Sequence, residues 1–223
     1  EIPAGEVTIE YGEWESGTYK VERRQTFLID QFFMAKYPIT NAQYQMFVEA
    51  HDGYQNVAWW GFSSDAQEWR KKNPQPDTSY FKGDNLPRES VTWYEAMAFC
   101  YWLSAKSKTE ITLPTEQQWQ RSAQGDDGRE FPWSSTFDKS LCNTEESGSK
   151  QTTPVTQYPQ GASPFGVMDM SGNVWEWTLS QWNNDKLDIT GNCGRVLRGG
   201  SWNGDLQFAR SVSRSSTYYS SSK

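Results

Sequence analysis

Histidine and cysteine are scarce in this chain of 223 residues, which has one histidine, His51, and three cysteines, Cys100, Cys142 and Cys193. A histidine-based catalytic triad would have to be built on His51, in a polar stretch where a solvated side chain is far more usual. The odd number of cysteines and the lack of any C-x-x-C spacing argue against a disulfide-dense scaffold and a structural zinc site. Cys100 falls on an apolar helical stripe and is expected in the core.

Long hydrophobic runs and clusters of basic residues are also missing. No apolar stretch approaches the roughly 20 residues of a membrane span, so no spanning helix is expected. The net charge of -7 argues against nucleic-acid binding, because a protein that grips phosphates needs clustered Lys and Arg. The chain is instead rich in aromatic residues, with 12 Trp, 11 Tyr and 11 Phe, which predict a core built on large rings. The compartment stays open.

Three helix starts share one signature, a Thr followed three residues later by Glu or Gln, which lets side chains satisfy the first N–H groups of a helix. The pairs are Thr40/Gln43, Thr92/Glu95 and Thr115/Gln118, with Gly125 expected to end the third helix. Short strands are expected at 6–10, 26–33 and 195–197. The polar, Trp-containing stretch 52–88 predicts a long surface insertion. We found no internal repeat and no linker, which predicts a single domain over residues 1–223.

Six motifs in a fixed order resemble the formylglycine-generating enzyme, or sulfatase-modifying factor, family. They are IPAGE at 2–6, YPITN at 37–41, VTWYEA at 91–96, LPTE at 113–116, GNVWEW at 172–177 and RGGSW at 198–202. The resemblance implies an α+β, C-type-lectin-like fold, rich in loops, with a few short helices and short antiparallel strands. The family usually closes with a strand carrying Gly-Phe-Arg, and this sequence reaches Lys223 without one, so the closing strand is expected to be missing.

The resemblance also gives a test for catalysis. Enzymes of this family oxidise a substrate cysteine with copper held by two cysteine thiolates, which are apt ligands for Cu(I). Counted from the motif at 198–202, the two thiolate positions are Gly204 and Ala209, and neither side chain can bind copper. We therefore expect no copper cofactor and no enzyme activity of this kind.

A calcium loop is the second property that the resemblance implies. The carboxylates of Asp169 and Glu176, together with the backbone carbonyls of Gly172 and Val174, match the family's set of hard oxygen ligands, which suits calcium. In the alternative interpretation, Asp169 caps a turn and Glu176 pairs with an arginine. A second calcium site of the family, at Asn143 and its neighbours, stays open because the loop is shorter here.

The C-terminal segment 203–222 changes in composition to Ser, Thr, Tyr, Asn and Asp around Arg210 and Arg214. Most of these residue types arise when the adenines of an Asn codon are mutated, and the segment resembles the variable region of proteins diversified by retroelements. Such mixtures combine rigid aromatic contacts with adaptable hydrogen bonds. The alternative is a flexible Ser-rich tail. The expected ligand-binding residues are Trp202, Asn203, Asp205, Leu206, Gln207, Phe208, Ser211, Ser213, Ser215, Ser216, Thr217, Tyr218 and Tyr219.

Three functions follow from the sequence. The first is a non-catalytic, receptor-like protein that binds an unknown protein or cell-surface ligand through this segment. The second is an enzyme of the same family with a formylglycine-generating or other chemistry. The third is a docking domain of a larger protein.

Overall fold

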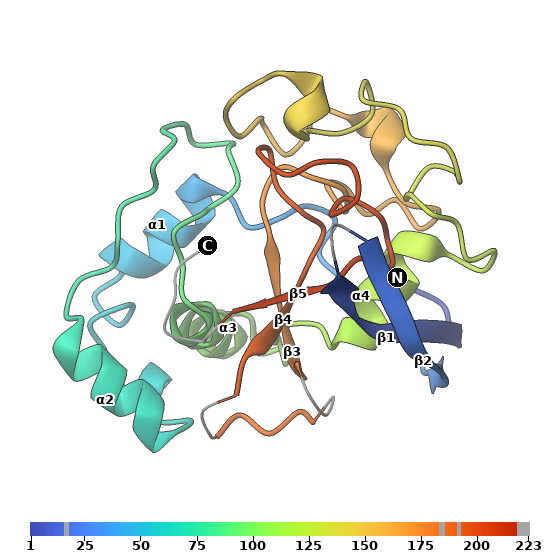
Figure 1. Ribbon diagram of the computed structural model, residues 1–223. Coiled ribbons are helices and arrows are strands. Elements are labelled where there is room, and N and C mark those ends of the chain that lie inside the picture. The colour runs from blue at the N-terminus through green and yellow to red at the C-terminus, as the bar shows by residue number, and fades with distance from the viewer. Residues whose placement is uncertain (16–17, 183–185, 191–192, 218–223) are drawn as a thin grey trace.

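The computed structural model describes residues 1–15, 18–182, 186–190 and 193–217. Figure 1 shows two small sheets, with α1, α2 and α3 to one side of the central sheet and α4 with the N-terminal hairpin to the other. The elements, in chain order, are β1 Gly5–Glu15, β2 Thr18–Ile29, α1 Asn41–Glu49, the 3-10 helix Val57–Trp60, α2 Ser64–Lys72, α3 Trp93–Ser107, α4 Glu116–Gln124, the 3-10 helices Glu145–Ser147 and Pro159–Gly161, β3 Glu176–Gln181, β4 Arg195–Arg198 and β5 Ser215–Thr217.

All three predicted helix starts are capping boxes in the structure, with Thr40, Thr92 and Thr115 as N-caps. In each one the Thr hydroxyl accepts from the third backbone N–H, and the Glu or Gln side chain returns to the N-cap backbone. Gly125 ends α4, as predicted. Cys100 is buried on α3, also as predicted. Each helix in the described part of the chain is too short or too polar to cross a membrane.

Aromatic rings fill the main core. Phe47 of α1 packs against Phe99 and Trp102 of α3, with ring centroids 5.8 and 5.4 Å apart. The indole N–H of Trp93 on α3 donates to the Thr178 carbonyl of β3 at 2.9 Å, which fastens the helix to the central sheet. The scarcity of aliphatic residues is therefore offset by ring packing, as the composition predicted.

The stretch 52–88 differs from the predicted surface insertion. It contains helix α2, with Ser63 as its N-cap, and it sends Tyr54 and Trp60 into the core, where both are almost fully buried. Arg70 of α2 lies over the Trp60 ring, with its guanidinium 5.3 Å from the ring centroid. The buried residues of α2 are Ala66 and Arg70, so the helix lacks the repeated apolar residues that would have predicted it.

The third strand of the central sheet, β5, is formed by the Ser-rich segment and is not the Gly-Phe-Arg strand that is expected to be missing. β5 pairs antiparallel with β4, with Leu197 opposite Ser215 and Arg195 opposite Thr217, giving the order β3-β4-β5. Thus three residues of the Ser-rich segment, 215–217, supply the pairing. A mixture of Ser and Thr does not by itself predict a strand. Here the pairing with β4 determines the extended conformation.

Candidate functional site

Exposure alternates along the first part of the predicted binding segment, residues 202–208. Asn203, Asp205 and Gln207 are exposed, whereas Trp202, Leu206 and Phe208 are partly buried. Successive tight turns produce this pattern, with backbone hydrogen bonds from Gly204 to Ser201, from Phe208 to Asp205 and from Ala209 to Leu206. The polar side chains are thus presented on a base of larger apolar ones.

The aromatic residues of this segment pack against rings from distant parts of the chain. Trp202 makes an edge contact with Phe81 at 5.4 Å between centroids, and Phe81 makes another with Tyr80 at 4.9 Å. Phe208 contacts Trp175 at 5.8 Å. Tyr80 is 79% exposed, so it extends the aromatic surface beyond Trp202. Sequence reasoning missed Tyr80 and Phe81, and only the aromatic content of the stretch 52–88 pointed to them.

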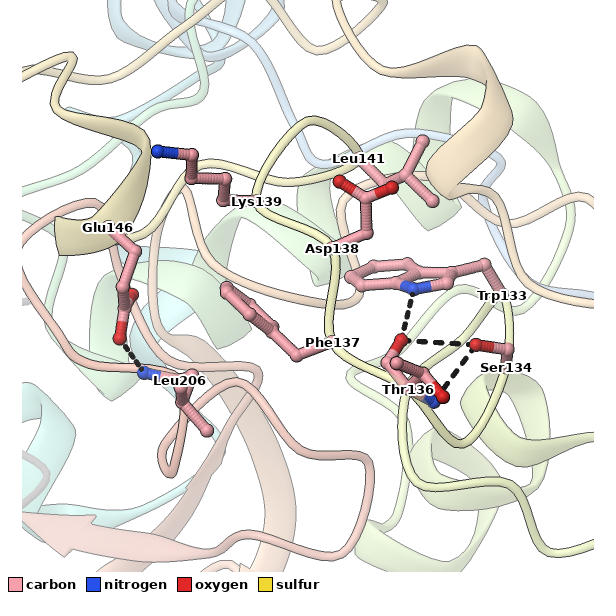
Figure 2. A pocket seen from close by; sticks show the side chains of 9 residues that line it. All are labelled: Trp133, Ser134, Thr136, Phe137, Asp138, Lys139, Leu141, Glu146 and Leu206. Atoms are coloured by element: carbon pink, nitrogen blue, oxygen red, sulfur yellow. Dashed lines mark hydrogen bonds between the residues drawn. The ribbon is translucent and has the colours of Figure 1, made fainter.

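Leu206 also borders a surface pocket (Figure 2). Its backbone N–H donates to the Glu146 carboxylate at 2.9 Å, and this contact joins the segment 202–208 to the loop that precedes residue 146. Trp133 and Phe137 form part of the opposite lining. The segment 202–208 is therefore flanked by aromatic residues on two sides.

Ser211 and Ser213 lie in the interior, unlike the surface position expected for ligand-binding residues. Ser211 is fully buried; its backbone N–H donates to the Glu130 carbonyl at 2.7 Å and its carbonyl accepts from Arg198 at 2.5 Å. The Ser213 hydroxyl donates to the Gln207 carbonyl. Ser215, Ser216 and Thr217 form β5, where Ser216 is exposed. Tyr218 and Tyr219 lie outside the described residues.

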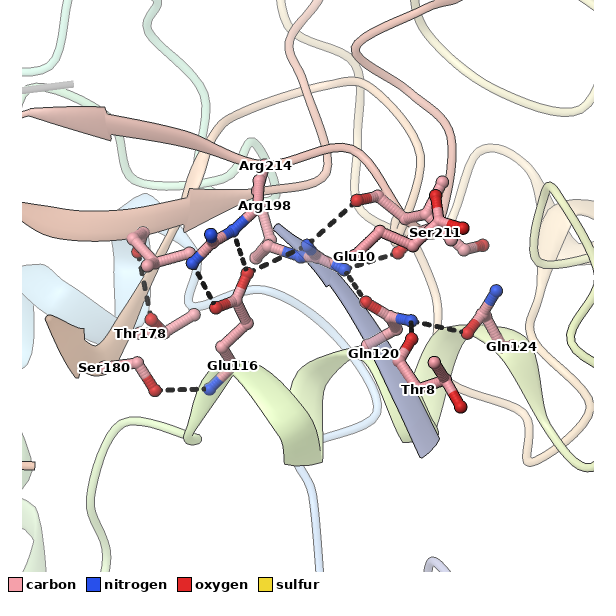
Figure 3. Close-up of polar contacts among 12 residues, drawn as sticks. Thr8, Glu10, Glu116, Gln120, Gln124, Thr178, Ser180, Arg198, Ser211 and Arg214 are labelled. Carbon is pink, nitrogen blue, oxygen red and sulfur yellow. Dashed lines mark hydrogen bonds and ion pairs between the residues drawn. The ribbon is translucent and has the colours of Figure 1, made fainter. Parts of the chain in front are cut away.

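Buried ion pairs explain why the segment turns inward at 210–214. Both Arg214 and Arg198 bind the carboxylate of Glu116, which lies at the start of α4 and is fully buried (Figure 3). Arg198 also donates to the Gln120 side chain at 2.7 Å. Burial lowers the pKa of Arg198 to about 10, which still leaves the guanidinium charged at neutral pH. Arg210 pairs with Glu130 at 2.6 Å.

The four predicted calcium ligands lie in the loop that leads into β3, and Glu176 is the first residue of that strand. Asp169 has a positive φ of 58°, and its carboxylate accepts from the Asn173 amide at 2.9 Å. The Glu176 carboxylate accepts from the Trp119 indole at 2.7 Å rather than pairing with an arginine. Burial raises the pKa of Asp169 to about 7, and burial together with the charge of Asp169 raises the pKa of Glu176 to about 8.

The chemistry of this donor set, two carboxylates and two carbonyls, suits calcium, which prefers oxygen ligands. Within the described residues, the carbonyls of Gly172 and Val174 accept no backbone hydrogen bond, so both are available as ligands. Two neighbouring carboxylates in a low-dielectric turn repel each other, and a divalent cation would remove that repulsion. No group of three or more His, Cys, Asp or Glu side chains gathers in the described part of the chain, so such a site depends on its backbone carbonyls. The Asn143 side chain, in contrast, is occupied by Ser147, Ser149, Gln151 and Asn173.

The two positions that the resemblance assigns to copper-binding thiolates, 204 and 209, are a glycine and an alanine. Gly204 lies in a turn with its nearest neighbours in Ser201, and Ala209 is fully buried. The Cys100 and Cys142 thiols are free and buried, and burial raises the pKa of each to about 12, which opposes the thiolate form that a metal requires.

The sequence model of the sulfatase-modifying factor enzyme 1-like domain matches residues 2–223. The chain belongs to this family. Hercynine oxygenase of Mycolicibacterium smegmatis is 32% identical over 205 residues, covering 78% of this chain and 46% of that protein. The formylglycine-generating enzyme of Mus musculus is 27% identical, covering 78% of this chain and 58% of that protein. The inactive C-alpha-formylglycine-generating enzyme 2 of Bos taurus is 31% identical, covering 66% of this chain and 48% of that protein. This member of the sulfatase-modifying factor family spans about half the length of these relatives.

Solved structures confirm the predicted fold. PvdO from Pseudomonas aeruginosa superposes with a TM-score of 0.73 at 21% identity, covering 99% of this chain and 88% of that one. Treponema denticola variable protein 1 superposes with a TM-score of 0.65 at 19% identity, covering 100% of this chain and 90% of that one. At these identities the likeness shows the fold alone. The resemblance to the formylglycine-generating family, drawn from six motifs, is confirmed.

Proposed function

We propose that this chain is a non-catalytic ligand-binding module of the sulfatase-modifying factor family. Residues 202–208, extended by Tyr80 and Phe81, form its binding surface. The single observation that carries the proposal is that the expected copper positions are Gly204 and a fully buried Ala209. Without two thiolates there, the copper-dependent oxidation of cysteine lacks its metal site.

The surface itself supports binding. Exposed Asn203, Asp205 and Gln207 stand beside the partly buried Trp202 and Phe208, so adaptable polar groups surround rigid rings. This combination is typical of binding surfaces that accept many partners. The ligand that we propose is a protein or a cell-surface molecule, and calcium held by the loop 169–176 would stabilise the adjacent turns.

We further propose that the segment is diversified by a retroelement, as its composition suggests. The buried positions narrow the proposal, because variation at Ser211 and Ser213 would disturb packing rather than contact a ligand. Comparing copies of the gene from one population tests this directly. Differences concentrated at 203, 205 and 207 support diversification, and uniform variation along the chain contradicts it.

The rival function is an oxidoreductase with formylglycine-generating chemistry, which the 27% identity to the formylglycine-generating enzyme of Mus musculus favours. A Cu(I) titration against a competing chelator, followed by a thiol-peptide oxidation assay, separates the two. We expect no tight copper binding and no turnover. Measurable conversion of a thiol to an aldehyde would overturn the proposal.

Site-specific cross-linking tests the binding surface. A photoreactive side chain at 203 or 207 should give cross-links with intact cells or their extracts, whereas one at the exposed Glu22 of β2 should not. Equal cross-linking at all three positions would show non-specific contact and would contradict a localised surface.

A further inference from the structure

The pocket beside Leu206 has a volume of about 860 Å³, in the range of small-ligand sites. It lies between the loop that leads to residue 146 and the proposed binding segment, so it continues the surface at 202–208. The residues that line it are Trp133, Ser134, Thr136, Phe137, Asp138, Lys139, Leu141, Glu146 and Leu206.

The partly buried rings of Trp133 and Phe137 form the aromatic side of the pocket, and both pack against a third ring that is fully buried. Phe131, which is 2% exposed, stacks on Trp133 at 5.5 Å and contacts Phe137 at 5.4 Å. The backbones of Phe131 and Ser134 exchange two hydrogen bonds, which fix the turn that carries Trp133. Phe131 covers one face of the indole, so the other face is left for contact from the pocket. In Figure 2 the Phe137 ring lies between Trp133 and the pair formed by Glu146 and Leu206.

The hydrogen-bond donors on this wall are already used within the turn. The Trp133 indole N–H donates to the Thr136 carbonyl at 3.0 Å, and the Ser134 hydroxyl donates to the same carbonyl at 3.1 Å. The Thr136 backbone N–H donates in turn to the Ser134 hydroxyl. On this side of the pocket, a ligand can therefore contact mainly the faces of the aromatic rings.

Two carboxylates lie in the lining, and Asp138 supplies the accessible acceptor. One Asp138 oxygen accepts from the backbone and hydroxyl of Ser140, and the other is left for a ligand. Glu146 accepts from the Leu206 N–H through one oxygen, and its other oxygen is buried, so this residue contributes charge to the pocket. The hydrogen bonds from Ser140 hold the pKa of Asp138 below its usual range. For Glu146, burial raises the pKa but is outweighed by contacts with Thr144 and Leu206, which leave it lowered. Lys139 is the one cation among the lining residues, so the lining carries two negative charges and one positive.

We propose that this pocket receives a basic side chain, lysine or arginine, of a protein partner; this inference rests on the proposed ligand-binding function. Such a side chain offers donors and no acceptor, which complements the free Asp138 oxygen and the net negative charge of the lining. Its cation packs favourably on the faces of Trp133 and Phe137. Its aliphatic stem contacts Leu141 and Leu206.

A neutral sugar is a poorer fit. Sugar hydroxyls need donors as well as acceptors at the site. The indole and Ser134 donors are engaged within the turn, which leaves the ammonium group of Lys139 as the charged donor of the lining. An acidic side chain would meet Asp138 and Glu146 with like charge. The position of Leu206 in the proposed variable segment implies that its side chain tunes how deeply the basic group enters.

The test uses the whole chain and four short capped peptides, Gly-X-Gly, in which X is arginine, lysine, citrulline or glutamate. The readout is the chemical shift of the Trp133 indole N–H by NMR, assigned with a Trp133→Phe variant. We expect saturable shifts with arginine and lysine. Citrulline keeps the shape of arginine without its charge and should bind at least about fivefold more weakly. Methyl glucoside serves as the sugar probe.

Variants of the lining residues sharpen the test. Asp138→Asn and Glu146→Gln keep size and hydrogen-bond acceptors, and each should weaken arginine binding by about three- to tenfold. Lys139→Gln should strengthen it by about two- to threefold, because it removes a like charge. Glu22→Gln, on β2, should leave it unchanged.

Several outcomes would overturn the inference: no shift with the arginine peptide, equal binding of citrulline and arginine, or a response to methyl glucoside that the charge variants do not alter. These outcomes are separate from failure of the proposed function. Copper-dependent turnover would refute the binding module itself, whereas an unresponsive pocket in a protein without turnover refutes only the basic side chain.

Discussion

Glu116 and Arg214 form a two-point ion pair across 98 positions of sequence, with Arg214 Nε 2.9 Å from Oε1 and Nη2 2.7 Å from Oε2 of the carboxylate. Arg198 donates to Oε1 of the same carboxylate at 3.0 Å (Figure 3). One acidic side chain at the start of α4 therefore fixes both β4 and the residue just before β5. These ion pairs hold residues 209–217 against the rest of the protein, whereas the turns at 202–208 lie at the surface.

Replacing Glu116 tests this anchor. Glu116→Gln leaves two buried guanidinium groups without their counter-charge, and we expect a loss of about 3–5 kcal/mol in the free energy of unfolding, measured with urea. The control is Glu10→Gln, which breaks a pair with Arg24, whose side chain is 64% exposed. That change should cost less than about 1 kcal/mol. Similar losses in both variants would contradict an anchoring role.

The division of the C-terminal segment predicts which positions tolerate change. Asn203→Tyr introduces a ring at an exposed position and should alter stability by less than about 0.5 kcal/mol. Ser211→Tyr forces a ring into a fully buried position and should cost about 3 kcal/mol or prevent folding. Thermal unfolding compares the two, and an equally stable Ser211→Tyr protein would return that residue to the candidate surface.

Local signals predicted part of this molecule well. The capping boxes at Thr40, Thr92 and Thr115 depend on residues three positions apart, so the sequence alone specifies them. The family's ordered motifs predicted the fold. Neither kind of signal depends on which distant segment lies beside the motif.

Features that depend on contacts between distant residues could not be predicted from local sequence signals. The burial of Ser211 follows from its contacts with Glu130 and Arg198, which lie far away in the sequence. Residues 215–217 form the strand β5 because their backbone pairs with β4. Likewise, the contact of Phe81 with Trp202 joins residues more than 100 positions apart, and the aromatic content of the stretch 52–88 does not predict which ring Phe81 meets.

The turn at Gly172 is predicted to require glycine. Its φ is +79°, and a Cβ there would lie 2.1 Å from the Asn143 carbonyl oxygen. Gly172→Ala should therefore cost several kcal/mol, on the order of 3 or more, by urea unfolding. Gly128 is the matched control, since its φ is +66° but no atom lies within 4 Å of the added Cβ. Gly128→Ala should cost about 1–2 kcal/mol. Equal losses would mean that the approach to Asn143 does not matter.

Calcium is predicted to stabilise the protein through the loop 169–176. A concentration of about 100 times the dissociation constant should add about 2.7 kcal/mol, visible as a higher melting temperature that EGTA reverses. Asp169→Asn and Glu176→Gln should abolish the response. Asp188→Asn, which changes an exposed turn residue, should keep it. An EGTA-insensitive melting temperature in the unmodified protein would remove calcium from the proposed function.

The buried Glu95 makes a prediction about pH. Its carboxylate is 2% exposed; desolvation raises its pKa, although hydrogen bonds from Thr92 and Tyr54 oppose the shift. An acid whose pKa is higher in the folded state binds its proton more tightly there, so its contribution to stability falls as pH rises from about 4.3, the unfolded value, through the folded pKa. We expect the unfolding free energy of the unmodified protein, relative to Glu95→Gln, to decline over this range. A relative stability that rises with pH would mean that the hydrogen bonds from Thr92 and Tyr54 outweigh the cost of burying the charge.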